Sequence, residues 1–306
     1  MKLKWWLLGA LIFASGIELY LWNPFHGKKP GKTDLKTAGL NGPVRTVYEW
    51  EIRTDSVKRD SLPQHYSSFN RGGMRVGGRS YSRDGELEGI DSLKYNRMGM
   101  LGEQDLYDKR GRFYGCFIYS YDRLGNNTGM QRLMENEKPE YEVTRKFDDR
   151  GNCIEEVLTT SHPDPPIIKR FTFDDKNNNT SVRIYTGDSM TLEVDYKYDA
   201  GSRQTETMDF GPGRQLRFRK VYEYNSNGDC TAEKEYDNSG RINHYERSSF
   251  TYDSSGRRTS VLTYMPPDTA VTYSLRSFYD EHGNMIRAVG RERGVQWITS
   301  RKIEYY

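Results

Sequence analysis

Cysteine, aliphatic side chains and net charge are all scarce in this sequence of 306 residues, which carries a formal charge of +3. The three cysteines, Cys116, Cys153 and Cys230, are odd in number and show no CxxC spacing. They therefore argue against a disulfide framework and against a zinc site. Apolar residues, with glycine included, make up roughly 37%, against about 45–50% in ordinary globular proteins. This scarcity disfavours a thick two-layer α/β core and a polytopic membrane protein.

Signatures of catalysis are missing as well. The sequence holds no GxSxG nucleophile elbow, and its five histidines show no HxH or HxxxH spacing. Paired acids such as Asp148 and Asp149 fall in predicted turns, where the first acid has a structural role. We therefore expect a protein that is not an enzyme, and we nominate no catalytic residue, no metal ligand and no cofactor.

Tyrosine, by contrast, is abundant. The chain holds 23 tyrosines and 12 phenylalanines, and aromatic residues make up 13% of the sequence. Because so many aromatic side chains can bury surface, the composition argues against disorder. An aromatic-rich and aliphatic-poor chain predicts a thin β-sheet.

The only long hydrophobic run covers residues 5–22, with lysines on both sides. As one helix it would be about 27 Å long, enough to cross a thin bilayer, so it predicts an uncleaved signal anchor. The alternative is a cleaved signal peptide with small residues at Ala14-Ser15-Gly16. Both interpretations export the rest of the chain to the bacterial cell envelope. The first places it in the periplasm, anchored to the inner membrane, and the second makes it periplasmic or secreted.

Charge and composition divide the chain into three parts. Residues 1–33 carry five lysines and one glutamate, which leaves the remainder at −1. The near-neutral remainder and its export both disfavour a nucleic-acid partner. We predict a leader over residues 1–22, a flexible linker rich in Gly, Pro and Lys over 23–42, and a β-sheet domain over 43–306.

Internal repetition organises that domain. An aromatic residue, Asp or Asn, two variable residues and Gly recur in twelve copies, five of them weaker. The weaker copies begin at Phe69, Tyr81, Tyr95, Phe173 and Tyr198. The predicted structural turn residues of the seven strong copies are Tyr107, Asp108, Gly111, Tyr121, Asp122, Gly125, Phe147, Asp148, Gly151, Tyr224, Asn225, Gly228, Tyr236, Asp237, Gly240, Tyr252, Asp253, Gly256, Tyr279, Asp280 and Gly283.

Physical chemistry explains this pattern as a β-turn. The Asp or Asn side chain accepts a hydrogen bond from the backbone two residues on, and the two variable residues take type I turn angles. The Gly then adopts a positive φ, as in a type I turn followed by a G1 bulge. Asn177 replaces Gly in one copy, and in the copy at Tyr198 the Gly comes one place early, at Gly201.

The spacing of the copies predicts the architecture. One subset begins at 69, 95, 121, 147, 173, 198, 224, 252 and 279, so each unit is a two-stranded hairpin of about 26 residues. The domain would be all-β, an antiparallel hairpin meander of about nine units and eighteen strands. Because open sheets rarely exceed about ten strands, we expect strong twisting into a spiral or partial closure. Cys153 and Cys230 would lie about six strands, or 29 Å, apart, and would stay unbonded unless the sheet rolls closed.

The repeated motif over roughly residues 65–306 resembles the Rhs or YD-repeat family. In that family the repeats form spiralling β-sheet shells and carry no catalytic residues of their own. This chain lacks the long array of a closed shell and ends at a repeat boundary, so the resemblance implies no toxin domain. It is more similar to short envelope-associated YD-repeat proteins, for which the resemblance implies carbohydrate binding.

Two sets of surface residues are candidates for interaction. Arg214, Arg217 and Arg219 form a basic run beside Phe218, which indicates contact with an acidic glycan or a solvated strand face. An Asp–Ser/Thr–aliphatic triplet resembles a bacterial O-glycosylation signature, although Asp-Ser also simply favours turns. Its candidate acceptors are Ser56, Ser61, Ser92, Ser189 and Thr269.

Together these observations predict a non-enzymatic binding or scaffold module of the bacterial envelope, with a glycan or an envelope protein as its partner. The N-terminal segment would contact the membrane. The alternatives are a glycan-active hydrolase on a rolled repeat sheet, and an orphan adaptor related to toxin-encasing shells.

Overall fold

The protein is all-β and antiparallel in a computed structural model that describes residues 33–53, 61–292 and 294–306. The predicted hydrophobic helix over 5–22 lies outside these residues. Within them, no helix is long and apolar enough to cross a membrane. The helical elements are α2 (Asp34–Thr37) and the short 3₁₀ turn η1 (Pro212–Arg214). The strands are β1 (Val44–Arg53), β2 (Ser61–Phe69), β3 (Arg75–Tyr81), β4 (Leu87–Tyr95), β5 (Leu101–Asp108), β6 (Phe113–Tyr121), β7 (Asn127–Met134), β8 (Pro139–Phe147), β9 (Cys153–Thr160), β10 (Ile167–Phe173), β11 (Asn179–Thr186), β12 (Ser189–Tyr198), β13 (Gln204–Phe210), β14 (Leu216–Tyr224), β15 (Cys230–Asp237), β16 (Ile242–Tyr252), β17 (Arg258–Tyr264), β18 (Val271–Tyr279), β19 (Met285–Glu292) and β20 (Val295–Tyr305).

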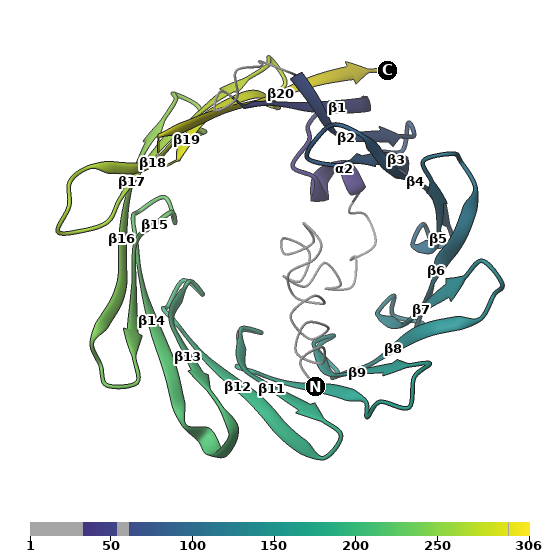
Figure 1. Ribbon diagram of the computed structural model, residues 1–306, viewed down its shortest axis with the longest axis horizontal. Helices are drawn as coiled ribbons and strands as arrows, with labels where there is room; N and C mark the ends of the chain where they lie inside the picture. Colours follow the sequence, from purple (N-terminus) through teal and green to yellow (C-terminus); the bar gives the residue numbers. More distant parts are fainter. Residues whose placement is uncertain (1–32, 54–60, 293) are drawn as a thin grey trace.

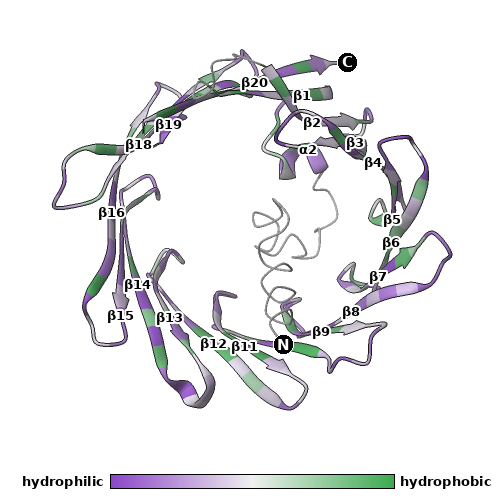
Figure 2. Cartoon of the chain, viewed as in Figure 1, coloured by the Kyte–Doolittle hydropathy of each residue, from purple (hydrophilic) through white to green (hydrophobic). Residues whose placement is uncertain are grey.

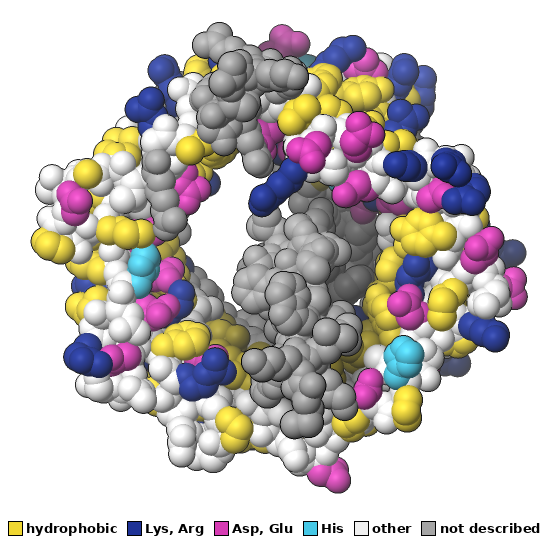
Figure 3. Space-filling view, in the orientation of Figure 1, with side chains coloured by type: hydrophobic (Ala, Val, Ile, Leu, Met, Phe, Trp, Pro, Cys, Tyr) yellow, Lys and Arg dark blue, Asp and Glu magenta, His cyan; other side chains and the backbone are white. Residues whose placement is uncertain are grey.

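The sheet is a closed ring, not an open or partly closed spiral (Figure 1). Each strand pairs with its neighbours in the chain, and β1 pairs with both β2 and β20. The prediction of eighteen strands in an open meander is therefore wrong: twenty strands form a closed antiparallel barrel. Twenty strands about 4.8 Å apart, tilted by about 35–45° as barrel strands are, give a diameter of roughly 37–43 Å. Side chains from opposite walls cannot fill that width, and Figure 3 shows a central hollow.

The predicted turn geometry is confirmed at all twelve copies. The fifth residue has a positive φ in each, including Asn177 at 64° and Ser202, rather than Gly201, at 61°. In the copy at Tyr121, Asp122 Oδ1 accepts from the backbone N–H groups of Leu124 and Asn126, each at 2.9 Å. Two further turns, at residues 133–137 and 210–214, share the positive fifth φ and the same backbone hydrogen bonds. They lack the Asp-and-Gly signature, and the sequence predicts them only as variable connectors at the opposite ends of the hairpins.

The excess of tyrosine over phenylalanine has a structural cause at the rim of the barrel, where the repeated turns lie. Turn tyrosines reach back and donate to a backbone carbonyl at the start of an earlier strand. Tyr121 donates to Leu101 at 2.8 Å, and Tyr224 donates to Gln204 at 2.6 Å. Tyr95, Tyr198 and Tyr279 make the equivalent bonds. Each such hydroxyl ties one turn to the hairpin before it, which a phenylalanine ring cannot do.

Closure takes the form of a turn built from both ends of the described chain. Tyr306 N–H donates to Pro43 O at 3.0 Å, the same bond that the repeated turns make around their aromatic residue. Gly42 has φ 78° and occupies the position of the turn glycine, with Tyr305 in the aromatic position. Asn284 clasps this split turn, because its side chain accepts from Asn41 N–H and donates to Asn41 O and to the Tyr305 hydroxyl.

Residues 33–42, predicted as part of a flexible linker, instead pack on the sheet. Helix α2 lies inside the ring in Figure 1. Leu35 and Leu40 are buried in a cluster with Val44 and Phe69, and Val47 packs against it. The short helix is capped by the Thr33 side chain, which accepts from Lys36 N–H. Burial of the two leucines holds residues 33–42 against the seam where β1 pairs with β20.

A single sheet layer leaves little apolar core elsewhere. Figure 2 shows polar and apolar residues mixed along the strands. Among the described residues, ten hydrophobic side chains are buried, and four of them form the cluster around α2. Cys153 and Cys230 are unbonded although the ring is closed. Closure joins β1 to β20, and β9 and β15 remain six strands apart.

Candidate functional site

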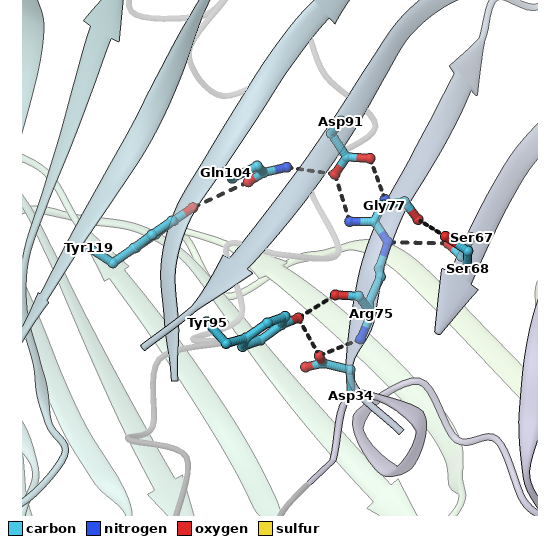
Figure 4. Close-up of polar contacts among 9 residues, drawn as sticks. All are labelled: Asp34, Ser67, Ser68, Arg75, Gly77, Asp91, Tyr95, Gln104 and Tyr119. Carbon is cyan, nitrogen blue, oxygen red and sulfur yellow. Dashed lines mark hydrogen bonds and ion pairs between the residues drawn. The ribbon is translucent and has the colours of Figure 1, made fainter. Parts of the chain in front are cut away.

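Helix α2 identifies which side chains face the inside of the ring. Its Asp34 carboxylate accepts a hydrogen bond from the Tyr95 hydroxyl at 2.6 Å (Figure 4). Since α2 lies within the ring, Tyr95 and the turn aromatics equivalent to it project inward. Alternation along each strand, and pairing across strands, then assign the remaining side chains to the inner or outer face.

A chain of polar contacts runs along the inner face from β3 to β6 (Figure 4). Arg75 makes a two-pronged ion pair with Asp91, at 2.7 and 2.8 Å. Asp91 also accepts from Gln104 at 2.8 Å, and Gln104 accepts from Tyr119 at 3.3 Å. Burial raises the pKa of the Tyr119 phenol, which therefore stays a neutral donor. This network joins four strands and, through Arg75 N–H and Asp34, also holds α2.

An open hollow of about 470 Å³ on the inner face of β16–β19 is a candidate ligand site. Phe250 and Tyr273 supply aromatic rings, Glu246 and Glu292 supply carboxylates, and Arg258 supplies a guanidinium. Hydroxyl groups, from Ser248 and Thr263, and apolar side chains, from Val261 and Leu275, complete the lining. The volume lies within the range of about 300–1,000 Å³ typical of small-molecule sites.

Electrostatics keep the phenol in this hollow neutral. Burial raises the pKa of Tyr273, the negative charge of Glu292 raises it further, and Arg258 opposes both effects. Arg258 lies over the Phe250 ring at 5.6 Å and donates to Asp229 at 3.0 Å. The hollow thus presents a phenol O–H, two carboxylates and a positioned guanidinium.

More charge lies beside the hollow, on β14 and β15. Lys220 Nζ lies 2.6 Å from Glu233 and 3.4 Å from Glu235. Burial is the largest single effect and lowers the pKa of Lys220. The hydrogen bond to Glu233 and the nearby negative charges of Glu233 and Glu235 together outweigh it, so the pKa is raised and the ammonium is retained. Glu233 lies directly opposite Glu246 in the sheet register, and His244 lies 3.7 Å from Glu246.

The positions of the carboxylates bear on chemistry. Glu246 and Glu292 lie three strand spacings apart, about 14 Å, which exceeds the roughly 5–9.5 Å between the carboxylates of glycosidases. Glu233 and Glu246, as cross-strand neighbours, have Cβ atoms about 4.5–5.5 Å apart. In the described part of the chain, no group of three or more His, Cys, Asp or Glu side chains is arranged to hold a metal.

The basic run predicted to contact a ligand is engaged in ion pairs. Arg214 lies 2.8 Å from Asp195, and Arg217 lies 3.3 Å from Asp209. Arg219 contacts Glu206 at 2.6 Å. Arg214 is the last residue of η1, whereas Arg217 and Arg219 belong to β14, and each of the three pairs with a different carboxylate. Ligand contact by these arginines stays a prediction.

The predicted glycosylation acceptors are scattered around the ring. Ser61 begins β2, Ser189 begins β12, and Thr269 lies between β17 and β18; all three are exposed. Ser92 is a half-buried residue within β4, and Ser56 lies outside the described residues. Their modification stays a prediction.

Comparisons with known proteins find only weak similarity to this chain. No model of a known protein family matches the chain. The tRNA3(Ser)-specific nuclease WapA of Bacillus spizizenii is 28% identical over 191 residues, a match covering 58% of this chain and 7% of that protein. The chain therefore corresponds to a small fraction of that relative.

Solved structures that resemble the chain include a toxin pore and a porin-like protein. The Photorhabdus luminescens Tc holotoxin pore is 10% identical, with 78% of this chain and 17% of that chain covered and a TM-score of 0.32. A porin-like protein from Bacteroides uniformis is 10% identical, with 86% and 99% covered and a TM-score of 0.38. Neither likeness carries an argument about function.

Proposed function

We propose that the protein is a non-enzymatic, extracytoplasmic carbohydrate-binding module of the YD-repeat family, with its ligand site in the inner hollow of β16–β19. The observation that carries the proposal is the lining of that hollow, which combines Phe250 and Tyr273 with Glu246, Glu292 and Arg258. The C–H faces of a sugar ring pack on aromatic rings, and its hydroxyl groups pair with carboxylates and guanidinium groups. Family membership is supported by the twelve turns of one geometry, and export by the hydrophobic run over residues 5–22.

Glycan titration of the full-length chain tests this function. Tyr273→Ala removes one ring from the hollow, and we expect affinity to fall about tenfold, since an aromatic contact is worth up to ~1.5 kcal/mol. Tyr236→Ala is the matched control and should leave affinity unchanged. Tyr236 is next to Glu235 in β15 and so lies on the opposite face of that strand from Glu233, Glu235 and the hollow. If no member of a broad glycan panel binds the native chain, or if both variants lose affinity equally, the proposal is wrong.

A hydrolase is the second candidate, and the cross-strand pair Glu233 and Glu246 is the feature that favours it. Two carboxylates on directly opposite residues can approach each other, and a retaining glycosidase needs its two carboxylates about 5–5.5 Å apart. Against it, Glu233 is already held by Lys220 at 2.6 Å. Release of reducing sugar from a bound glycan, abolished by Glu246→Gln, would establish the hydrolase; binding without release would dismiss it.

A further inference from the structure

The outer face of β8–β12 holds a row of charges with an unusual order. Residues directly opposite one another across these strands are Lys146, Glu155, Arg170, Arg183 and Glu193. They belong to the outer face because Lys146 and Arg170 each precede an inward-facing aromatic residue. Cations and carboxylates alternate along the row except at the centre, where the two arginines are cross-strand neighbours. Like charges directly opposite in a sheet are destabilising, so this pairing needs an explanation.

The carboxylates on either side leave guanidinium donors available at the centre. Glu155 is bonded to Arg170 Nε at 3.2 Å, and Glu193 to Arg183 Nε at 3.0 Å. Each guanidinium carries five N–H donors, so one bond through Nε engages a single donor. Glu155 is shared with Lys146 at 2.7 Å, and its charge is divided between two cations. The row carries three cations and two carboxylates. Asp195 lies opposite Ser181 but is ion-paired with Arg214 at 2.8 Å, so a surplus of positive charge remains around the two arginines.

A hollow of about 460 Å³ lies over the same residues. Arg170, Arg183, Lys146 and Ser181 line it, together with the ion-paired Glu155 and with Tyr185, over whose ring Arg170 lies at 5.1 Å. Ser181 is 8% exposed, and its Oγ has no hydrogen-bond partner among the described residues. A buried hydroxyl without a partner costs roughly 1–3 kcal/mol of desolvation and is rare in folded proteins.

We infer that this outer hollow binds the phosphate or sulfate ester group of a small saccharide, held between Arg170 and Arg183 with Ser181 as a third donor. An oxyanion there would neutralise the facing guanidinium groups and would give the Ser181 hydroxyl its acceptor. The hollow is larger than an oxyanion alone requires, and the Tyr185 ring offers a surface for a sugar. The site does not depend on the inner hollow of β16–β19, so either can be tested without the other.

Binding of glucose 6-phosphate to the full-length chain, measured by calorimetry with glucose as the reference, tests the site. We expect glucose 6-phosphate to bind and glucose not to bind. Ser181→Ala should weaken binding about 3- to 10-fold, through loss of one hydrogen bond, and Arg183→Gln by at least about tenfold. Arg112→Gln is the matched control, because Arg112 is ion-paired with Asp108 at 2.7 Å in a turn outside the hollow.

Thermal unfolding gives a second readout that does not depend on the sugar. The native chain should gain stability in sodium phosphate relative to sodium chloride of equal ionic strength, and Arg183→Gln should lose that gain. The inference is overturned if glucose binds as tightly as its phosphate, if the control loses as much affinity as Ser181→Ala, or if phosphate stabilises every variant equally.

Discussion

The split turn that closes the ring makes a quantitative prediction about Asn284. Its side chain is 1% exposed and makes three hydrogen bonds across the seam, of 2.7, 2.8 and 2.8 Å, to Asn41 and to the Tyr305 hydroxyl. At about 0.5–1.5 kcal/mol for each bond, Asn284→Ala should lower the free energy of unfolding by roughly 1.5–4.5 kcal/mol. The loss should concentrate at the seam, because these bonds join the ends of β1 and β20.

Asn126→Ala provides the matched control for this change. Asn126 follows its turn glycine as Asn284 does, but its side chain donates locally, to Asp122 at 2.8 Å. We expect a loss of only about 0.5–1.5 kcal/mol for that variant. Urea unfolding measures both losses, and hydrogen exchange should show faster exchange in β1 and β20 for Asn284→Ala alone. If the two variants differ by less than about 1 kcal/mol, Asn284 is not a clasp and the reasoning is refuted.

Three other changes test the repeated turns. Tyr224→Phe removes the bond to Gln204 O and should cost about 0.5–1.5 kcal/mol in urea unfolding; an unchanged midpoint would contradict the proposed tyrosine ladder. Hydrogen bonds from Ser239 and Arg241 lower the pKa of Asp237 to about 2, and those of other turn aspartates are lowered too. Their stabilisation is present above the unfolded pKa near 4 and is lost as pH falls towards 2, so the unfolding temperature should drop across that window; a flat profile would contradict this. Joining Tyr306 to Gly42 through two residues completes the split turn but removes α2 and Asn41, so a circular permutant with new ends in an exposed turn should fold with a lower unfolding midpoint than the native chain, as circular dichroism and cooperative unfolding would show.

The turns could be predicted because everything that forms them is local. An aspartate, its own backbone and one residue of positive φ lie within six positions, so the chemistry is visible in the sequence. Ser202 shows where such prediction from local sequence fails. The turn keeps its five-residue length and places the positive φ on Ser202, although the glycine stands one place earlier in the sequence. The turns at residues 133–137 and 210–214 are a second such failure. There the flanking strands, paired in register, impose the same turn geometry on residues that lack the Asp-and-Gly signature.

The candidate sites were less accessible to sequence reasoning. Glu246 and Glu292 reach one hollow from strands far apart in the repeat order, and Arg170 faces Arg183 only because β10 and β11 pair in one register. The predicted basic run followed nearness in the sequence, and the structure shows its three arginines ion-paired to separate carboxylates. The pairing of Arg170 with Arg183 could have been predicted from the sequence. The two residues are spaced about the turn at Phe173 so that a hairpin there makes them cross-strand partners.

The sequence by itself determined the unit of this protein: an antiparallel hairpin of about 26 residues, with its turn chemistry and its tyrosines. Tertiary structure alone decided that the units close into a ring of twenty strands, which face of each strand looks inward, and which charges meet. The reason is physical. A turn is stabilised by atoms a few residues apart, whereas closure depends on the accumulated twist of the whole sheet and on pairing between Val44 and Tyr305, at opposite ends of the described chain.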